Sequence, residues 1–191
     1  MSLVAAALRF AAHHHGHQFR KGTRIPYLSH LLNVCAWLAR REYDDEILAA
    51  ALLHDVVEDT DATLGQVTDG FGTRVATIVA GATELEKLEK KALNKAATWQ
   101  QRKEQTLHFL RHDASYEQLL VSGADKLDNL HSLVTDHALV GEALWLRFNA
   151  PKALQQWYYT SVALLLEEKA ELDPVFGEMA TEMKAGLRHL F

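Results

Sequence analysis

The chain has 191 residues, of which 48% are hydrophobic and 24% charged, a balance that excludes a disordered chain and suits one globular domain with a substantial core. Its formal net charge of −5 argues against a broad nucleic-acid-binding surface, although a local group of cations could still bind a small anion. The sequence contains no run of 18 or more apolar residues, so we expect no membrane-spanning helix and no membrane partner.

Apolar residues recur at helical spacing along most of the chain, and alternating β-branched runs are absent, so we predict an all-α fold of about ten helices. In chain order, the predicted helices span residues 3–16, 28–41, 45–58, 63–70, 72–82, 99–112, 116–135, 141–149, 151–170 and 174–189. Capping boxes are predicted at Thr63 and Ser115, each of which has Gln three residues later. Asp173 is a predicted N-cap because Pro174 follows it.

No internal repeat or linker divides the sequence, so residues 1–191 are predicted to form a single domain, as a monomer or a small homo-oligomer. The polar stretch 84–103 is either a solvated helix pair or a flap beside a site. The single cysteine, Cys35, cannot form an internal disulfide, which fits the cytoplasm. Most histidines of the run 13–17 are expected to be solvated or structural.

Residues 47–59 carry the most information about chemistry. The segment from Ile47 to Leu53 is apolar on nearly every face, as in a central buried helix, and four ionisable residues follow it within two turns: His54, Asp55, Glu58 and Asp59. Burying such groups is costly unless they are paired or bind a metal. At helical spacing, His54 and Glu58 face one way, and Asp55 and Asp59 face a similar way.

Two distant residues strengthen this signal. His30 stands 24 residues before His54, and Asp125 stands 70 residues after Asp55 in another apolar helical stretch. Two imidazoles and two carboxylates suit a divalent ion of borderline hardness and leave room on it for water or a phosphate oxygen. Such a set would serve phosphoester hydrolysis, in which the metal activates water and stabilises phosphoryl charge.

In this order, His30, His54-Asp55 and Asp125 resemble the HD superfamily of metal-dependent phosphohydrolases. Three longer strings, at residues 20–30, 51–60 and 124–130, are similar to the hydrolase domain of Rel/Spo homologues and above all to stand-alone small alarmone hydrolases. The resemblance covers about residues 5–165 and implies an HD fold for that part, with residues 174–189 as a C-terminal helix.

The resemblance implies a cytoplasmic enzyme that removes pyrophosphate from the 3′ position of (p)ppGpp or (p)ppApp and leaves GDP or GTP, or the adenosine equivalents. The four residues above would bind one divalent ion, most plausibly Mn²⁺, with Fe²⁺, Zn²⁺, Co²⁺ or Ni²⁺ as alternatives. Glu58 and Asp59 would position or activate the attacking water. The substrate-binding candidates are cations, polar groups and one aromatic residue: Arg20, Lys21, Lys103, Asn129, Arg147, Lys152 and Tyr158.

Two positions depart from the family pattern: Leu31 stands where proline is common and His131 where arginine is common. Three alternatives therefore stay open. The site could act on another substrate, as a 5′-nucleotidase or an NADPH phosphatase would, or the chain could be a non-catalytic nucleotide-binding module. The Glu58-Asp59 pair argues against that module. Aromatic residues near Tyr158 could instead simply be core.

Overall fold

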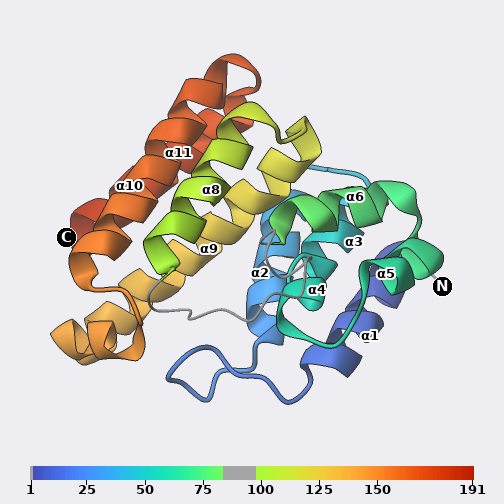
Figure 1. The fold of residues 1–191 in the computed structure, drawn as a ribbon, viewed down its shortest axis with the longest axis horizontal. Coiled ribbons are helices and arrows are strands. Elements are labelled where there is room, and N and C mark those ends of the chain that lie inside the picture. Colours follow the sequence, from blue (N-terminus) through green and yellow to red (C-terminus); the bar gives the residue numbers. More distant parts are fainter. Residues whose placement is uncertain (1, 84–97) are drawn as a thin grey trace. The chain divides into compact units, whose positions relative to one another are not determined.

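In the computed structural model, residues 2–83 and 98–191 are described, and apart from one isolated β-bridge between Phe19 and Pro26 their regular elements are helices (Figure 1). The all-α prediction is therefore confirmed. Residues 84–97 of the polar stretch lie outside the described part. The chain divides into two compact units, Met1–Lys91 with Ala114–Asp125, and Ala92–Asp113 with Lys126–Phe191. The assignment of residues 1–191 to a single HD domain stays a prediction.

The first unit is built around a short apolar helix. Its elements are α1 (Leu3–His15), α2 (Leu28–Ala39), α3 (Asp45–Leu53), α4 (Val56–Asp59), α5 (Leu64–Phe71), α6 (Thr73–Ala82) and the beginning of α9 (Tyr116–Val140). Six of the nine residues of α3 are buried, and α1, α2 and α6 pack around it (Figure 1). A helix that is apolar on most faces needs neighbours on most sides, and this surrounded position satisfies that requirement.

The break between α3 and α4 is a correction to the sequence analysis, which predicted one helix over 45–58. The helix ends at Leu53, and Asp55 adopts φ −98° and ψ −5° before α4 begins. The Nδ1 atom of His54 lies 2.8 Å from the carbonyl oxygen of Ala51, the atom that would accept the Asp55 amide in a continuous helix. A side chain thus competes with the backbone at this point and interrupts the helix.

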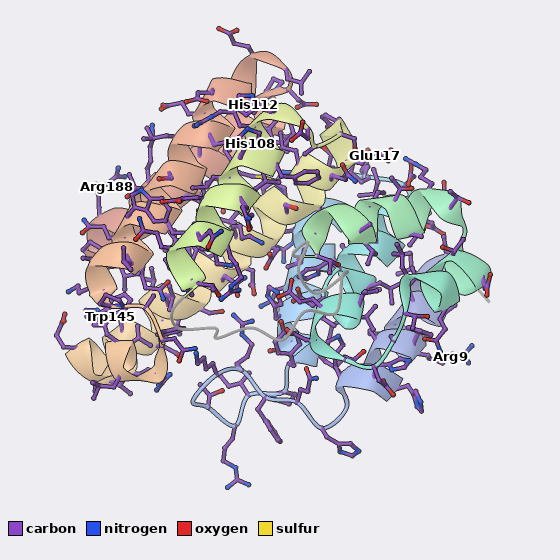
Figure 2. All side chains as sticks on the ribbon, in the orientation of Figure 1. Arg9, His108, His112, Glu117, Trp145 and Arg188 are labelled. Carbon is purple, nitrogen blue, oxygen red and sulfur yellow. The ribbon has the colours of Figure 1, made fainter. Side chains whose placement is uncertain are left out.

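The second unit contains α8 (Trp99–His112), the remainder of α9, the 3₁₀ helix η1 (Gly141–Arg147), α10 (Lys152–Glu168), the short 3₁₀ helix η2 (Lys169–Glu171) and α11 (Pro174–Leu190). Within it, α10 packs against α8 and α11 (Figure 1). Gly186 of α11 lets that helix approach α9, since a β-carbon there would lie 3.2 Å from Leu130. Trp145 of η1, which is labelled in Figure 2, stacks on Phe191 with ring centres 5.3 Å apart.

Other boundaries follow the predictions closely. The capping boxes at Thr63 and Ser115 are present, and the Asp173 side chain accepts the Val175 amide. Gly72 separates α5 from α6 with φ +90°, a conformation that favours glycine. The helix predicted over 116–135 continues to Val140, and the one predicted over 141–149 is 3₁₀. No helix in the described residues is long and apolar enough to cross a membrane.

An arginine joins three elements of the first unit. Arg74 of α6 pairs with Asp44 at 2.8 Å, Glu46 at 2.6 Å and Glu117 at 2.6 Å (Figure 2 labels Glu117). These carboxylates stand at the start of α3 and at the start of α9. The hydrogen bond from Arg74 is the main cause that holds the pKa of Asp44 below its usual value.

We expect Arg74→Met to lower the free energy of unfolding by about 1 to 2 kcal/mol at neutral pH, because three partly exposed ion pairs are lost together. A depressed carboxyl pKa contributes stability above the unfolded pKa and loses it as the pH falls through the folded pKa. The gap between variant and wild type should therefore narrow in acid. Urea unfolding followed by circular dichroism at several pH values measures this gap.

The matched control is Arg111→Met, because Arg111 makes an exposed pair with one carboxylate, that of Glu168. Arg111→Met should lower the free energy of unfolding less than Arg74→Met does. An equal loss in the two variants, or a difference between Arg74→Met and wild type that does not change with pH, would show that the three ion pairs of Arg74 do not stabilise the fold as proposed.

Candidate metal centre

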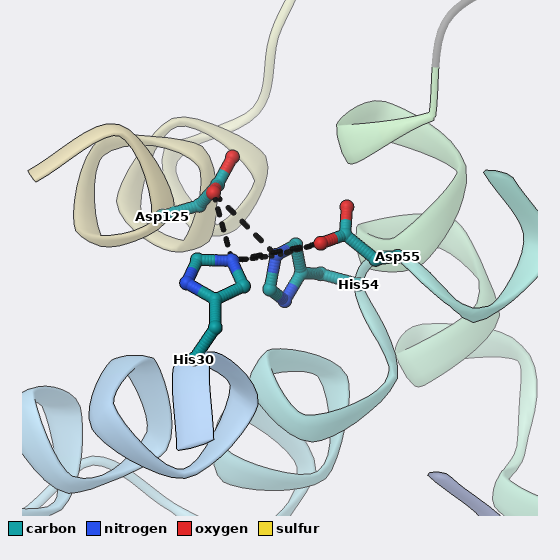
Figure 3. Close-up of side chains that lie close together, drawn as sticks. All are labelled: His30, His54, Asp55 and Asp125. Atoms are coloured by element: carbon teal, nitrogen blue, oxygen red, sulfur yellow. Dashed lines mark hydrogen bonds and ion pairs between the residues drawn. The ribbon is translucent and has the colours of Figure 1, made fainter. Parts of the chain in front are cut away.

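Four side chains from three parts of the first unit point toward one another (Figure 3). His30 comes from α2, His54 and Asp55 from the break between α3 and α4, and Asp125 from α9. One potential ligand atom from each lies within 4.8 Å of all the others. The structure thus brings together all four residues that the sequence analysis proposed as metal ligands, so they could hold a metal ion.

The distances within this cluster suit an enclosed cation. His30 Nε2 lies 3.2 Å from His54 Nε2, 3.5 Å from Asp55 Oδ2 and 3.2 Å from Asp125 Oδ1. His54 Nε2 lies 3.0 Å from Asp55 Oδ2 and 3.6 Å from Asp125 Oδ1. With metal–ligand bonds of about 2.1 Å, neighbouring ligand atoms stand about 3.0 Å apart in an octahedron and about 3.4 Å apart in a tetrahedron. These five distances, which run from 3.0 to 3.6 Å, are therefore close to those expected around such an ion.

Most of the cluster is buried, and burying ionisable groups is costly unless they are paired or bind a cation. His30, His54 and Asp125 expose at most 4% of their surface. The Nδ1 atom of His54 is engaged by the Ala51 carbonyl, so Nε2 is the nitrogen that faces the cluster. This arrangement is the usual one for a metal-binding histidine, whose second nitrogen is held by a backbone or carboxylate oxygen.

The electrostatics favour positive charge at the centre. Burial alone would lower the pKa of His54, but the Asp55 and Asp125 carboxylates outweigh it and raise that pKa well above its usual value. Burial would likewise raise the pKa of Asp55, yet His54 and His30 hold it well below its usual value. Carboxylates that stabilise a proton on an imidazole also stabilise a divalent cation that displaces it.

The two acidic residues that are candidates for catalysis lie on the single helical turn that follows the cluster. Glu58 and Asp59 are the last two residues of α4; Glu58 is half-buried and Asp59 is exposed. The backbone amide of Asp59 donates to the Asp55 carbonyl at 2.9 Å, so helical spacing is kept from Asp55 to Asp59 despite the break.

The loop between α1 and α2 carries the first two substrate-binding candidates. The Arg20 guanidinium lies 5.6 Å from the ring centre of Tyr27, whose hydroxyl donates to Asp55 Oδ2 at 2.5 Å. Arg20 therefore lies beside a residue, Tyr27, that contacts the cluster directly. Lys21 is exposed on the same loop.

The other substrate-binding candidates belong to the second unit. Arg147 pairs with Asp136 at 2.6 Å, and Lys152 pairs with Glu142 at 2.7 Å. Lys103 lies 5.2 Å from the ring centre of Tyr158, which is buried. Asn129 is half-buried on α9. Their roles toward a substrate stay predictions.

Sequence reasoning gave no role to three residues that structure places beside the cluster. Tyr27 contacts Asp55, its ring stacks on His15, and His15 is hydrogen-bonded to Gln18. His15 is 1% exposed, whereas His13 and His17 are exposed, so the histidine run contains one buried member. Tyr27 stands three residues before His30, and this spacing was the available signal.

Comparisons with known proteins agree with this geometry. The family model of the HD domain matches residues 7–146. A guanosine-3′,5′-bis(diphosphate) 3′-pyrophosphohydrolase of Aquifex aeolicus is 37% identical over 130 residues, which are 68% of this chain and 18% of that protein. The enzyme of the same name called MESH1 from Danio rerio is 37% identical over 135 residues, 69% of each chain.

A solved structure is also similar to this chain. It is that of a metazoan orthologue of SpoT that hydrolyses ppGpp, with a TM-score of 0.74 and 28% identity over 100% of this chain and 98% of that one. This chain spans less than a fifth of the Aquifex protein and about two thirds of MESH1. It belongs to the HD-domain family and is homologous to the Rel/Spo (p)ppGpp hydrolases and to the stand-alone MESH1 hydrolases.

Proposed function

We propose that the protein is a metal-dependent guanosine-3′,5′-bis(diphosphate) 3′-pyrophosphohydrolase that converts (p)ppGpp into GDP or GTP and pyrophosphate. The observation that carries the proposal is the convergence of the buried residues His30, His54 and Asp125 with the partly buried Asp55. The names of the homologous enzymes supply the substrate class. We place the reaction in the cytoplasm, and (p)ppApp is the alternative substrate of the same chemistry.

In this proposal the four clustered residues hold one divalent ion, and we favour Mn²⁺ because a mixed set of imidazole and carboxylate ligands suits it. When bound, such an ion lowers the pKa of water and neutralises phosphoryl charge. His54 presents Nε2 because its Nδ1 is held by the Ala51 carbonyl. Asp55 presents Oδ2, the oxygen nearest both imidazoles.

Glu58 is proposed as the general base. It is half-buried on α4, three residues after Asp55, and so stands near the cluster while keeping access to solvent. It would take a proton from the water that attacks the phosphorus next to the ribose. The bond between that phosphorus and O3′ then breaks, and O3′ takes up a proton as pyrophosphate leaves. Asp59, one residue later, would orient the water.

Binding of the nucleotide is assigned first to the loop before α2. A planar guanidinium can stack on a base or pair with a phosphate, and Arg20 lies beside Tyr27 at the edge of the cluster. Lys21 would add a second cation. For Asn129, Lys103, Arg147, Lys152 and Tyr158, the proposed role in substrate binding rests on the resemblance in sequence alone.

The direct test is a substrate screen. Purified protein with Mn²⁺ is given ppGpp, ppApp, deoxynucleoside monophosphates and NADPH, and the products are separated by chromatography. We expect ppGpp or ppApp to yield the nucleoside 5′-diphosphate and pyrophosphate. Intact alarmones together with dephosphorylated monophosphates or NADPH would replace this proposal with one of the alternative phosphatases, and no turnover of any compound would favour a binding module.

The ligand set is tested by Asp125→Asn, which keeps the shape of the side chain but removes its charge. We expect Mn²⁺ binding, measured by calorimetry, to weaken by two orders of magnitude or more, roughly what losing a bound charge-assisted ligand of about 3 kcal/mol would cause. Asp69→Asn on the exposed surface of α5 is the control and should bind normally. Unchanged binding in Asp125→Asn would remove this residue from the site.

The base is tested by Glu58→Gln, which keeps the size of the side chain but cannot accept the proton. We expect normal Mn²⁺ binding and a fall in kcat of about 10²-fold or more, the range of general base catalysis. Stopped assays at saturating substrate measure this fall. Full activity in the variant would show that another group takes the proton.

A further inference from the structure

We infer that Tyr27 is a positioning residue, which fixes the Asp55 carboxylate for metal binding and is itself held by His15 and Gln18. The inference rests on the proposed metal site. It assigns a task to the segment between α1 and α2 that is separate from nucleotide binding.

Tyr27 contacts Oδ2 of Asp55, which is the carboxylate oxygen that faces the two imidazoles. The Tyr27 hydroxyl donates to Oδ2 of Asp55 at 2.5 Å, and the same oxygen lies 3.0 Å from His54 Nε2 and 3.5 Å from His30 Nε2. A carboxylate oxygen has two lone pairs, so it can accept the phenol on one side and face the cluster with the other. The hydroxyl therefore limits rotation of the carboxylate, as outer hydrogen bonds do in other metal sites.

Tyr27 is the donor in this contact, because an ionised carboxylate can only accept a hydrogen bond. Its hydroxyl is also 3.4 Å from Asp59 Oδ2, so this one donor lies beside carboxylates at both ends of α4.

A buried imidazole supports the Tyr27 ring. The His15 and Tyr27 rings are stacked, with centres 5.0 Å apart and planes at 16°. His15 Nδ1 lies 2.8 Å from Gln18 Oε1, and since that oxygen can only accept, Nδ1 carries the hydrogen. Nε2 of His15 has no hydrogen-bond partner among the described residues. A buried nitrogen without a hydrogen-bond partner is costly. The hydrogen bond from Nδ1 to Gln18 offsets part of the cost of burying the His15 imidazole, which stacking on Tyr27 alone would not do.

Gln18 connects this support to the far end of α4. Its side-chain Nε2 donates to the backbone carbonyl of Asp59 at 2.8 Å, and its backbone carbonyl accepts the backbone amide of Tyr27 at 2.9 Å. The four-residue helix α4 is thus tied at Asp55 through Tyr27 and at Asp59 through Gln18. One helical turn is not stable alone, so such outside ties are what can fix its position.

The test is Tyr27→Phe, which removes one oxygen atom and keeps the ring that stacks on His15. Tyr43→Phe is the matched control, because Tyr43 is also in the first unit and its hydroxyl lies 2.9 Å from that of Tyr116, in a contact that involves no cluster residue. Binding is measured by titrating each protein with Mn²⁺ alone and following free Mn²⁺ by electron paramagnetic resonance. Melting without metal is followed by circular dichroism.

We expect Mn²⁺ affinity to fall about 10- to 100-fold in Tyr27→Phe, the range found when outer hydrogen bonds of metal ligands are removed, and to stay normal in Tyr43→Phe. Gln18→Ala provides a second variant at a half-buried position and should weaken Mn²⁺ binding less than Tyr27→Phe but more than the control. If Tyr27→Phe does not fold, the Mn²⁺ affinity of Gln18→Ala tests the inference instead.

Two results would overturn the inference: wild-type affinity in both Tyr27→Phe and Gln18→Ala, or an equal loss in the Tyr43→Phe control. A wild-type protein that binds no Mn²⁺, Fe²⁺ or Zn²⁺ would instead overturn the metal site itself. Failure of the inference and failure of the proposed function therefore give different results.

Discussion

The rest of the first unit depends on one electrostatic constraint, which is the convergence of two imidazoles and two carboxylates within 4.8 Å of one another, with His30, His54 and Asp125 buried and Asp55 partly buried. Unpaired charges are costly to bury, so each of these groups needs a fixed partner or a cation. The fold supplies three supports, in α2, in the α3–α4 break and in α9, and surrounds the apolar helix α3 with other helices. The apolar core thus serves to hold polar groups in place.

The break in the helix is the second element of this arrangement. A continuous helix over 45–58 would place successive side chains about 100° apart, so neighbouring His54 and Asp55 would diverge. By taking the Ala51 carbonyl, His54 ends α3, and Nε2 of His54 and Oδ2 of Asp55 come within 3.0 Å. The same side chain therefore bends the backbone and presents a ligand atom.

Most of the fold was predictable because its signals are local. Helical periodicity, the capping boxes at Thr63 and Ser115, and Asp173 before Pro174 each depend on residues within a few positions of one another. One error fell at His54, where a side-chain contact with the Ala51 carbonyl overrides the local helical pattern. The predicted end of α9 at residue 135 was also too early, because the helix continues to Val140. The spacing of Tyr27 before His30 was a signal for the tyrosine, but it could not identify the partners of Tyr27, because Asp55 and His15 lie 28 and 12 positions away in the sequence.

The all-α class, most helix positions and the four candidate ligands could be predicted from the amino-acid sequence, since residue type and motif order carry that information without coordinates. The three-dimensional fold was needed to show that these ligands meet, that α3 ends at Leu53, and that the buried His15 stacks on Tyr27. The physical reason is that periodicity reports which face of a helix is apolar. It does not report which distant side chain packs on that face, or which lone pair a buried donor will meet.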